Sequence, residues 1–470
     1  MKKSLLLLFC LLGFALPLWA KPTPATQQDS NLYTYTLKNG MPLFVKTDHR
    51  APTAVHMLWM RVGSVDEFNG TTGVAHALEH MMFKGTPTVP AGEFSRKVAA
   101  LGGEENAFTS RDYTNYFQQI PANRLEEVMK LEADRFANNA WPDGEFEHEI
   151  TVVQEERRMR TDDQPRALLY ERLMATAFMA HPYRRPIIGW MDDLENLTAD
   201  DVRHFYKTWY TPANAALVVA GDVNPEEVYQ LAEKYYGSLE GVEPPTRKPQ
   251  NEPEQMGVKR IVVKAPADQP YLLMAYRVPK LNNLLEPSTS DREALALTVL
   301  SAILDGNDGA RFERNLIQSE QRVADAASTS NGLYGRGPQM FYVEGIPAQG
   351  RTVEDLEKAL HAEIQRVADD GVTEDELQRV KNQWIASQVY NRDSVFNQAR
   401  QLGTYWALGL PENANDRLIE WLRTVTAEEV QAVAKKYFNE DQLSTAVLDP
   451  QERKAGEGRR GMGMNLELMR

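Results

Sequence analysis

Two histidines and a glutamate lie close together near the start of the chain. Residues 73–85 read Gly-Val-Ala-His-Ala-Leu-Glu-His-Met-Met-Phe-Lys-Gly, which places His76, Glu79 and His80 in an H-x-x-E-H pattern. If this segment is helical, the two histidines are one turn apart on the same face. Two imidazoles at that spacing can bind one metal ion, and Glu79 can reach a water in an open coordination position. An amphipathic helix with two incidental histidines is the alternative, and the order of the three residues argues against it.

A third ligand has to come from another element. The only Cys, Cys10, lies in an N-terminal leader, so the ligand must be a histidine or a carboxylate. Glu149 and Glu156 are seven residues apart, which is two helical turns, so both face the same way. Glu155 lies about 100° round the helix from Glu156 and breaks this spacing. Alone, these carboxylates indicate a solvated helix face, but the histidine motif upstream favours a ligand.

An H-x-x-E-H motif followed about 75 residues later by an E-x6-E helix resembles the inverted-zincin metallopeptidases of the pitrilysin/insulinase family. The chain is most similar to the short subunits related to the mitochondrial processing peptidase and to their bacterial relatives. The resemblance implies that His76, His80 and Glu156 hold one Zn²⁺ per chain. It also implies that Glu79 is the general base and that Glu149 orients a ligand from behind.

Residues 106–120 read as strand, turn and strand, which on their own indicate a sheet hairpin. The resemblance implies that the first strand is an edge strand beside the zinc, to which a peptide adds through backbone hydrogen bonds. By the same resemblance Asn106 and Ala107 hold the substrate backbone, and Phe108 lines a neighbouring pocket. Such docking predicts broad specificity for extended peptides and excludes folded proteins.

The second half of the chain departs from the family pattern. Active relatives place an Arg and, seven residues later, a Tyr there, and both stabilise the oxyanion. Alignment puts Ile317 and Ala324 at these positions, and the second half has no other Arg-x6-Tyr. Loss of one oxyanion donor costs about 10²–10³ in turnover, so we expect the isolated chain to be a poor enzyme. The resemblance implies a homologous second subunit that supplies the pair in a heterodimer, and a homodimer is the alternative assembly.

These residues predict a zinc-dependent endopeptidase that hydrolyses extended peptides or unfolded segments. One alternative is a non-catalytic assembly subunit of the same fold, although such subunits normally lack ligands. Another is a module that captures peptides without turnover, in which a structural zinc would have four protein ligands.

The elements around these residues predict an α+β fold. Residues 33–45 contain an Asn39-Gly40 turn between alternating strands, which indicates a hairpin. Residues 53–62 and 214–221 read as further strands, and residues 90–101 and 125–139 as helices.

The second half repeats the first. Thr198-Ala-Asp-Asp-Val202 matches Thr426-Ala-Glu-Glu-Val430 at an offset of 228. Strands at 257–264 and 271–278 parallel the opening hairpin, and a helix at 294–304 takes the place of the metal helix without its ligands. The prediction is two homologous halves, each a mostly antiparallel sheet packed with helices.

The expected division follows composition. Its parts are a signal peptide at 1–20, a linker at 21–32, an N-terminal zinc-binding peptidase half at 33–240, a linker at 241–256, a C-terminal homologous half at 257–450 and a mobile tail at 451–470.

The N-terminus indicates export. Lys2 and Lys3 precede an apolar run from Leu5 to Leu18, with a cleavage site near Ala20. An uncleaved anchor is the alternative, but the run is short for a spanning helix, and no other segment is apolar enough to cross a bilayer. We therefore expect a periplasmic or secreted protein whose mature chain has no cysteine.

The charge of the chain bears on its partners. It has 52 basic and 66 acidic side chains, a formal net charge of −14. This balance argues against a nucleic-acid partner and favours basic or neutral peptides.

Overall fold

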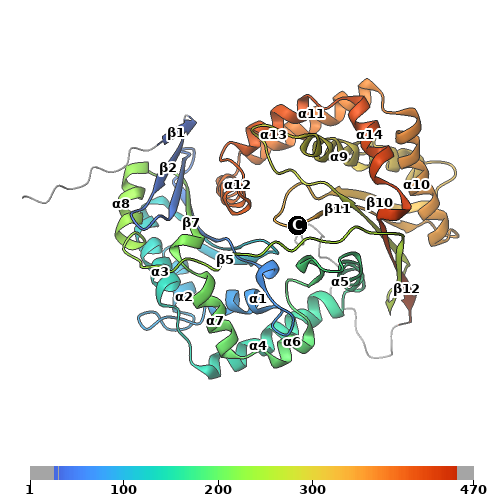
Figure 1. The fold of residues 1–470 in the computed structure, drawn as a ribbon. Helices are drawn as coiled ribbons and strands as arrows, with labels where there is room; N and C mark the ends of the chain where they lie inside the picture. The colour runs from blue at the N-terminus through green and yellow to red at the C-terminus, as the bar shows by residue number, and fades with distance from the viewer. Residues whose placement is uncertain (1–25, 30, 453–470) are drawn as a thin grey trace, which may run out of the picture.

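The computed structural model describes residues 26–29 and 31–452. The expected leader, and residues 453–470 of the expected tail, lie outside these described residues. Figure 1 shows two sheets, each with its own helices, formed by the first and the second half of the chain. The predicted α+β fold with two halves is therefore confirmed.

The first sheet has the strand order β1-β2-β3-β7-β4-β6-β5. All its neighbours are antiparallel except β3 and β7, which run parallel. Its strands are β1 Thr26–Asp29, β2 Leu32–Thr36, β3 Pro42–Thr47, β4 Thr53–Met60, β5 Glu104–Thr109, β6 Thr114–Pro121 and β7 Ala215–Gly221. Strand β1 falls within the segment 21–32 that the sequence presents as a linker, whereas residues 241–256 carry no helix or strand.

The helices of the first half precede, connect or follow these strands. They are α1 Val74–Met81, α2 Glu93–Ala100, α3 Leu125–Asn138, α4 Asp143–Arg157, α5 Pro165–Ala177, α6 Met191–Asn196, α7 Ala199–Trp209 and α8 Pro225–Tyr235.

The second sheet repeats the topology of the first. Its order is β10-β11-β9-β12-β8, which matches β5-β6-β4-β7-β3 strand for strand, and β8 runs parallel to β12 as β3 does to β7. Its strands are β8 Lys259–Pro266, β9 Tyr271–Val278, β10 Ala324–Asn331, β11 Gln339–Pro347 and β12 Leu443–Gln451, and its helices are α9 Thr289–Asp305, α10 Val353–Asp370, α11 Glu374–Asn391, α12 Val395–Leu408, α13 Ala414–Arg423 and α14 Ala427–Tyr437.

This topology corrects one expectation. Strands β8 and β9 correspond to β3 and β4, and not to the opening hairpin β2-β3. The central strand β12 separates β8 from β9, just as β7 separates β3 from β4. A strand that arrives from far along the chain is therefore inserted between strands that are neighbours in sequence.

The repeated motif marks equivalent helices. Thr198 and Asp201 form a capping box at the start of α7, and Thr426 and Glu429 form the same box at the start of α14. Each helix is followed by the strand that lies between two neighbours of its sheet, β7 or β12. The internal repeat predicted from the sequence is confirmed.

Each half lends one helix to the other half's sheet. Helix α5 packs its Leu169 and Leu173 against Leu273 of β9, and α12 packs Ala399 and Leu402 of the second half against the face of β4 and β7 (Figure 1). The approach of α12 requires a glycine, because a Cβ on Gly403 would lie 2.0 Å from the indole of Trp59. Apolar burial is the main favourable term in folding, so this exchange joins the halves.

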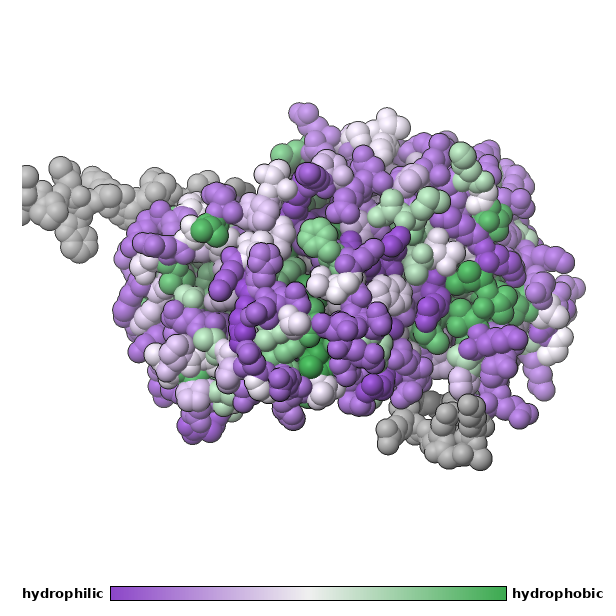
Figure 2. All heavy atoms as spheres, turned by 60° about the horizontal axis from the view of Figure 1, so that its bottom comes forward, coloured by the Kyte–Doolittle hydropathy of each residue, from purple (hydrophilic) through white to green (hydrophobic). Residues whose placement is uncertain are grey.

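The outer surface is largely hydrophilic. Figure 2 shows hydrophilic side chains over most of the face seen from below in Figure 1, with apolar ones gathered in a few patches. No helix among the described residues is long and apolar enough to cross a membrane.

Candidate active site

Helix α1 is held at its N-terminus by a buried glutamate. Its N-cap, Gly73, has φ +87°, a conformation that favours glycine, and a Cβ there would lie 2.5 Å from the carbonyl oxygen of Ile188. The Glu67 carboxylate accepts hydrogen bonds from the backbone N–H groups of Gly73 and Ala75, each at 2.9 Å. Two of the N–H groups that every helix start leaves unpaired are thereby satisfied. The sequence analysis missed this residue.

The two histidines of α1 meet Glu156 of α4. His76 and His80 lie one turn apart, with ring centroids separated by 4.8 Å. Glu156 Oε2 lies 3.2 Å from His80 Nε2 and 3.8 Å from His76 Nε2. One ligand atom from each residue falls within 4.8 Å of the others, and no other such trio of His, Cys, Asp or Glu occurs among the described residues.

Glu149 contacts the far side of the His80 ring rather than the space between the three candidate ligands. Its Oε1 lies 2.9 Å from His80 Nδ1, and its other oxygen pairs with Lys84. A bond at Nδ1 fixes the ring of His80 so that Nε2 faces Glu156. Glu155 instead pairs with Arg158 and is 66% exposed at its side chain, so the structure separates the two neighbouring glutamates.

Charge is balanced around a position that suits a cation. Burial alone would lower the pKa of His80, but its bonds to Glu149 and Glu156 raise it to about 9. Burial opposes ionisation of Glu156, yet its bond to His80 and the charges of His76 and Arg160 lower its pKa to about 2. Burial, together with the neighbouring His80, lowers the pKa of His76 to about 4. Glu156 is thus ionised and His76 neutral, as ligands must be, whereas a metal ion would have to displace a proton from His80.

The donor set fits a zinc ion. His76 Nδ1 is buried without a hydrogen-bond partner among the described residues, so its ring is held by packing and by whatever its Nε2 binds. Two imidazoles and one carboxylate leave a fourth position open, which is the pattern of catalytic rather than structural zinc sites.

Glu79 faces strand β5. It accepts a hydrogen bond from the hydroxyl of Thr109, the last residue of that strand, and burial raises its pKa to about 7. A carboxyl group that ionises near neutral pH can both accept and return a proton. Nothing local in the sequence signals Thr109, because the contact spans 30 residues.

We expect Thr109→Val to lower kcat about tenfold with little change in KM, because a single neutral hydrogen bond that aims Glu79 is lost. Thr109→Ser keeps the hydroxyl and should restore most of the activity. Steady-state kinetics on a quenched peptide, with thermal melts of all three chains, checks this. Equal losses in the two variants would contradict an aiming role.

We expect Glu149→Gln to weaken zinc affinity by roughly 10–100-fold, because a partner that orients a ligand is lost. Activity should fall at limiting zinc and return in excess zinc. Glu147→Gln, an exposed position on the same helix, is the matched control and should match the parent chain. Competition against a zinc-chelating dye measures both affinities, and an unchanged affinity in Glu149→Gln would refute the orienting role.

Strand β5 lies at the edge of its sheet and pairs only with β6 among the described residues. Asn106 is exposed and its side-chain oxygen accepts from the N–H of Ala107. Ala107 packs with the core on the α1 side, whereas Phe108 packs against Trp59 on the face that α12 covers. The strand is therefore open for pairing, with Thr109 at the end nearest Glu79.

Three other histidines, and the two residues aligned with the Arg and Tyr of active relatives, lie elsewhere. His56 is fully buried between Gln118 and Tyr236, His148 is exposed on α4, and His181 caps a short turn. Ile317 and Ala324 pack with the core of the second half. Within the described residues, no hydrogen bond or ion pair joins an Arg or Tyr of the second half to His76, Glu79, His80 or Glu156.

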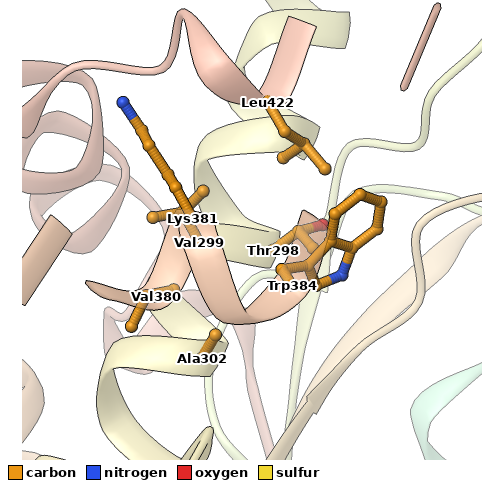
Figure 3. A pocket seen from close by; sticks show the side chains of 7 residues that line it. All are labelled: Thr298, Val299, Ala302, Val380, Lys381, Trp384 and Leu422. Carbon is orange, nitrogen blue, oxygen red and sulfur yellow. The ribbon is translucent and has the colours of Figure 1, made fainter. Parts of the chain in front are cut away.

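A narrow crevice in the second half does not compete as a site. Figure 3 shows a crevice in the second half between α9, α11 and α13, with Lys381 Nζ pointing away from it. Its volume of about 10 Å³ is room for a water molecule at most.

Two family models match consecutive parts of the chain. Residues 43–190 match the family described as "Insulinase (Peptidase family M16)", and residues 196–384 match "Peptidase M16 inactive domain". The chain belongs to the M16 peptidase family. The inactive-domain match begins just before α7 of the first half and continues into the second half, and no group of metal ligands lies within it among the described residues.

Individual proteins that are similar to this chain include members of the same family. The chain is 31% identical over 420 residues to "Zinc protease PqqE" of Helicobacter pylori, covering 88% of this chain and 92% of that one. It is 25% identical to the "Probable mitochondrial-processing peptidase subunit beta, mitochondrial" of Arabidopsis thaliana, covering 88% of this chain and 78% of the relative. A solved structure, "The crystal structure of a protease from Helicobacter pylori", superposes with a TM-score of 0.82 at 29% identity, covering 89% and 99%.

Proposed function

We propose that the chain is a zinc-dependent endopeptidase that hydrolyses extended peptides or unfolded segments. The observation that carries this proposal is the meeting of His76, His80 and Glu156 within 4.8 Å, beside a Glu79 that faces an open strand edge. Relatives named zinc proteases support the same chemistry.

The proposed roles follow from position. His76, His80 and Glu156 hold one Zn²⁺ per chain, which supplies Lewis acidity toward a peptide carbonyl and toward water. Glu79 accepts the proton of the attacking water and returns it to the leaving amine. Glu149 keeps the ring of His80 in place.

Substrate enters as an added strand. The free edge of β5 offers backbone groups to an extended peptide, with Asn106 and Ala107 as the pairing residues. Phe108 lies on the opposite face, and we propose that it shapes the neighbouring pocket through its packing on Trp59. A folded protein offers no free strand and is not a substrate.

A second subunit completes the oxyanion site. Ile317 and Ala324 stand where active relatives carry Arg and Tyr, and both are packed in the second core. We propose that a different homologous chain supplies these donors in a heterodimer; a homodimer is the alternative assembly, in which the second copy lacks the same pair. The alternative is a non-catalytic or peptide-capturing subunit of the same fold, consistent with the inactive-domain match of residues 196–384.

The cellular location of the protein and its division into segments are proposed from the sequence. We propose a signal peptide at 1–20, a periplasmic or secreted mature protein, and halves at 33–240 and 257–450 joined by the linker 241–256. A structural neighbour at 20% identity is described as the first half of a periplasmic protease, PqqL of Escherichia coli.

The test combines metal content with cleavage. The purified chain is assayed for zinc and for hydrolysis of a quenched unfolded peptide, alone and with a co-expressed homologous chain that carries Arg-x6-Tyr. One zinc per chain, with cleavage that rises when the partner is added, is the expected result. Zinc without cleavage in either case would leave the peptide-capturing alternative, and absence of zinc would refute the metal site.

A further inference from the structure

One arginine near the proposed site has no acidic partner. Arg111 begins the turn that joins β5 to β6. Within the described residues the only hydrogen bond of its side chain is from Nη2 to the hydroxyl of Tyr170 at 3.3 Å, and it forms no ion pair. Its Nε is buried and without a partner. The rings of Tyr170 and Tyr183 lie 5.8 and 5.5 Å from its guanidinium carbon.

Most other buried arginines of the chain face carboxylates, and Arg61 and Arg185 donate instead to the backbone carbonyls of Trp406 and Glu67. Arg157 meets Glu171 at 2.8 Å, and Arg336 meets Asp66 at 2.7 Å through both nitrogens. Enclosing a guanidinium without an anion is costly, which is why such pairs are the rule. Arg111 departs from this rule while remaining half-buried, so a ligand can reach it.

The adjacent acidic residue, Asp112, already accepts hydrogen bonds from other groups. Asp112 accepts a hydrogen bond from the hydroxyl of Tyr183 at 2.5 Å, and its other oxygen accepts from the backbone N–H of Arg336 at 3.1 Å. Its two oxygens thus join the β5–β6 turn to Tyr183 of the first half and to Arg336 of the second half, and neither accepts a hydrogen bond from Arg111.

Two tyrosines complete the surroundings. Tyr170 from α5 and Tyr342 from β11 are half-buried, and their hydroxyls lie 3.3 Å apart beside the guanidinium. Phenol hydroxyls donate to carboxylates, and a planar guanidinium binds a carboxylate with two parallel hydrogen bonds. The three side chains come from both halves of the molecule. The acceptors that they meet are uncharged: the tyrosine hydroxyls, and the thioether sulfur of Met174 at 3.2 Å from the Tyr342 hydroxyl.

The position relates this cluster to the proposed peptide path. Thr109 touches Glu79, and Arg111 follows it by two residues, a span of at most about 7 Å along an extended chain. A peptide paired with β5, with its scissile bond at Glu79, would pass Arg111 a few residues from that bond.

We propose that Arg111, with the hydroxyls of Tyr170 and Tyr342, binds a carboxylate of the peptide substrate. The carboxylate belongs either to an acidic side chain or to the C-terminus of the peptide. This inference rests on the proposed function, because it takes β5 as the strand that receives the substrate.

The experiment measures binding rather than turnover. The zinc-loaded Glu79→Gln chain is titrated, by fluorescence anisotropy, with labelled unfolded peptides in which a single Glu is moved stepwise along a Gln-containing sequence. Each peptide is made with a free and with an amidated C-terminus. The same titrations are repeated with Arg111→Gln added and, as a matched control, with Arg172→Gln, an exposed position on α5.

We expect one Glu position, or the free C-terminus, to improve Kd about tenfold over its neutral counterpart. Arg111→Gln should abolish that preference while leaving the affinity for neutral peptides unchanged, and Arg172→Gln should preserve it. Dependence on the Glu position identifies a side-chain carboxylate, and dependence on amidation identifies the C-terminus.

Two results would overturn the inference. Equal weakening of acidic and neutral peptides by Arg111→Gln, or no effect, would mean that Arg111 only packs between tyrosines. Absence of binding by any peptide would also overturn it. The proposed function is judged separately, by cleavage with the wild-type chain, so each can fail without the other.

Discussion

A chain carrying Glu79→Gln is expected to bind zinc normally and to lose peptide hydrolysis by at least about 10³-fold. Glu79 is the one acidic group on α1 beside the two histidines, and its carboxylate is aimed by Thr109. A glutamine has the same shape and accepts the same hydrogen bond, but it cannot take a proton from water. General acid and base catalysis contributes about 10²–10⁴ in rate, and here one group serves both steps.

The measurement is turnover of a quenched peptide together with zinc content by elemental analysis. Glu195→Gln, an exposed position on α6, is the control for removal of one carboxylate and should retain activity. Hydrolysis retained in a Glu79→Gln preparation free of wild-type chain would remove Glu79 as the base and would favour the capturing alternative.

The second large effect is expected at Glu156. Glu156→Gln should abolish tight zinc binding, and hydrolysis with it, because the charged oxygen that lies 3.2 Å from His80 Nε2 is replaced by a neutral amide. The structure also predicts a destabilising side effect, since Glu156 Oε1 pairs with Arg160 at 2.6 Å. Excess zinc should restore only part of the activity.

The neighbouring residue provides the control. Glu155→Gln removes one carboxylate from the same helix and the next position, but Glu155 pairs only with Arg158 at the surface. Zinc titration of both variants by calorimetry decides between them. Loss of zinc affinity in Glu155→Gln, with Glu156→Gln unaffected, would contradict the ligand set.

Local patterns account for what could be predicted. The turn spacing of His76 and His80 and the two-turn spacing of Glu149 and Glu156 are properties of single helices, and the structure places the four side chains together. The capping boxes at Thr198 and Thr426 likewise carry their own signal, three residues away in each case. Such features depend on the helix period alone.

Long-range contacts account for what could not. The Glu67 carboxylate accepts a hydrogen bond at the start of α1 because the chain between them folds back. The hydroxyl of Thr109 on strand β5 donates to Glu79 on helix α1. The insertion of β12 between β8 and β9 is invisible from sequence order, which is why those strands were assigned to the wrong counterpart. Arg111 has no motif, and it is distinguished only by a side chain that reaches neither a carboxylate nor a backbone carbonyl among the described residues.

The reciprocal exchange of α5 and α12 explains why a half with no ligands is kept. Without α12, Trp59 and its neighbours on one face of the first sheet would be exposed to water. Without α5, one face of the second sheet would be exposed in the same way. Each half therefore keeps an apolar sheet face of the other half out of water, and we expect either half expressed alone to aggregate through that face.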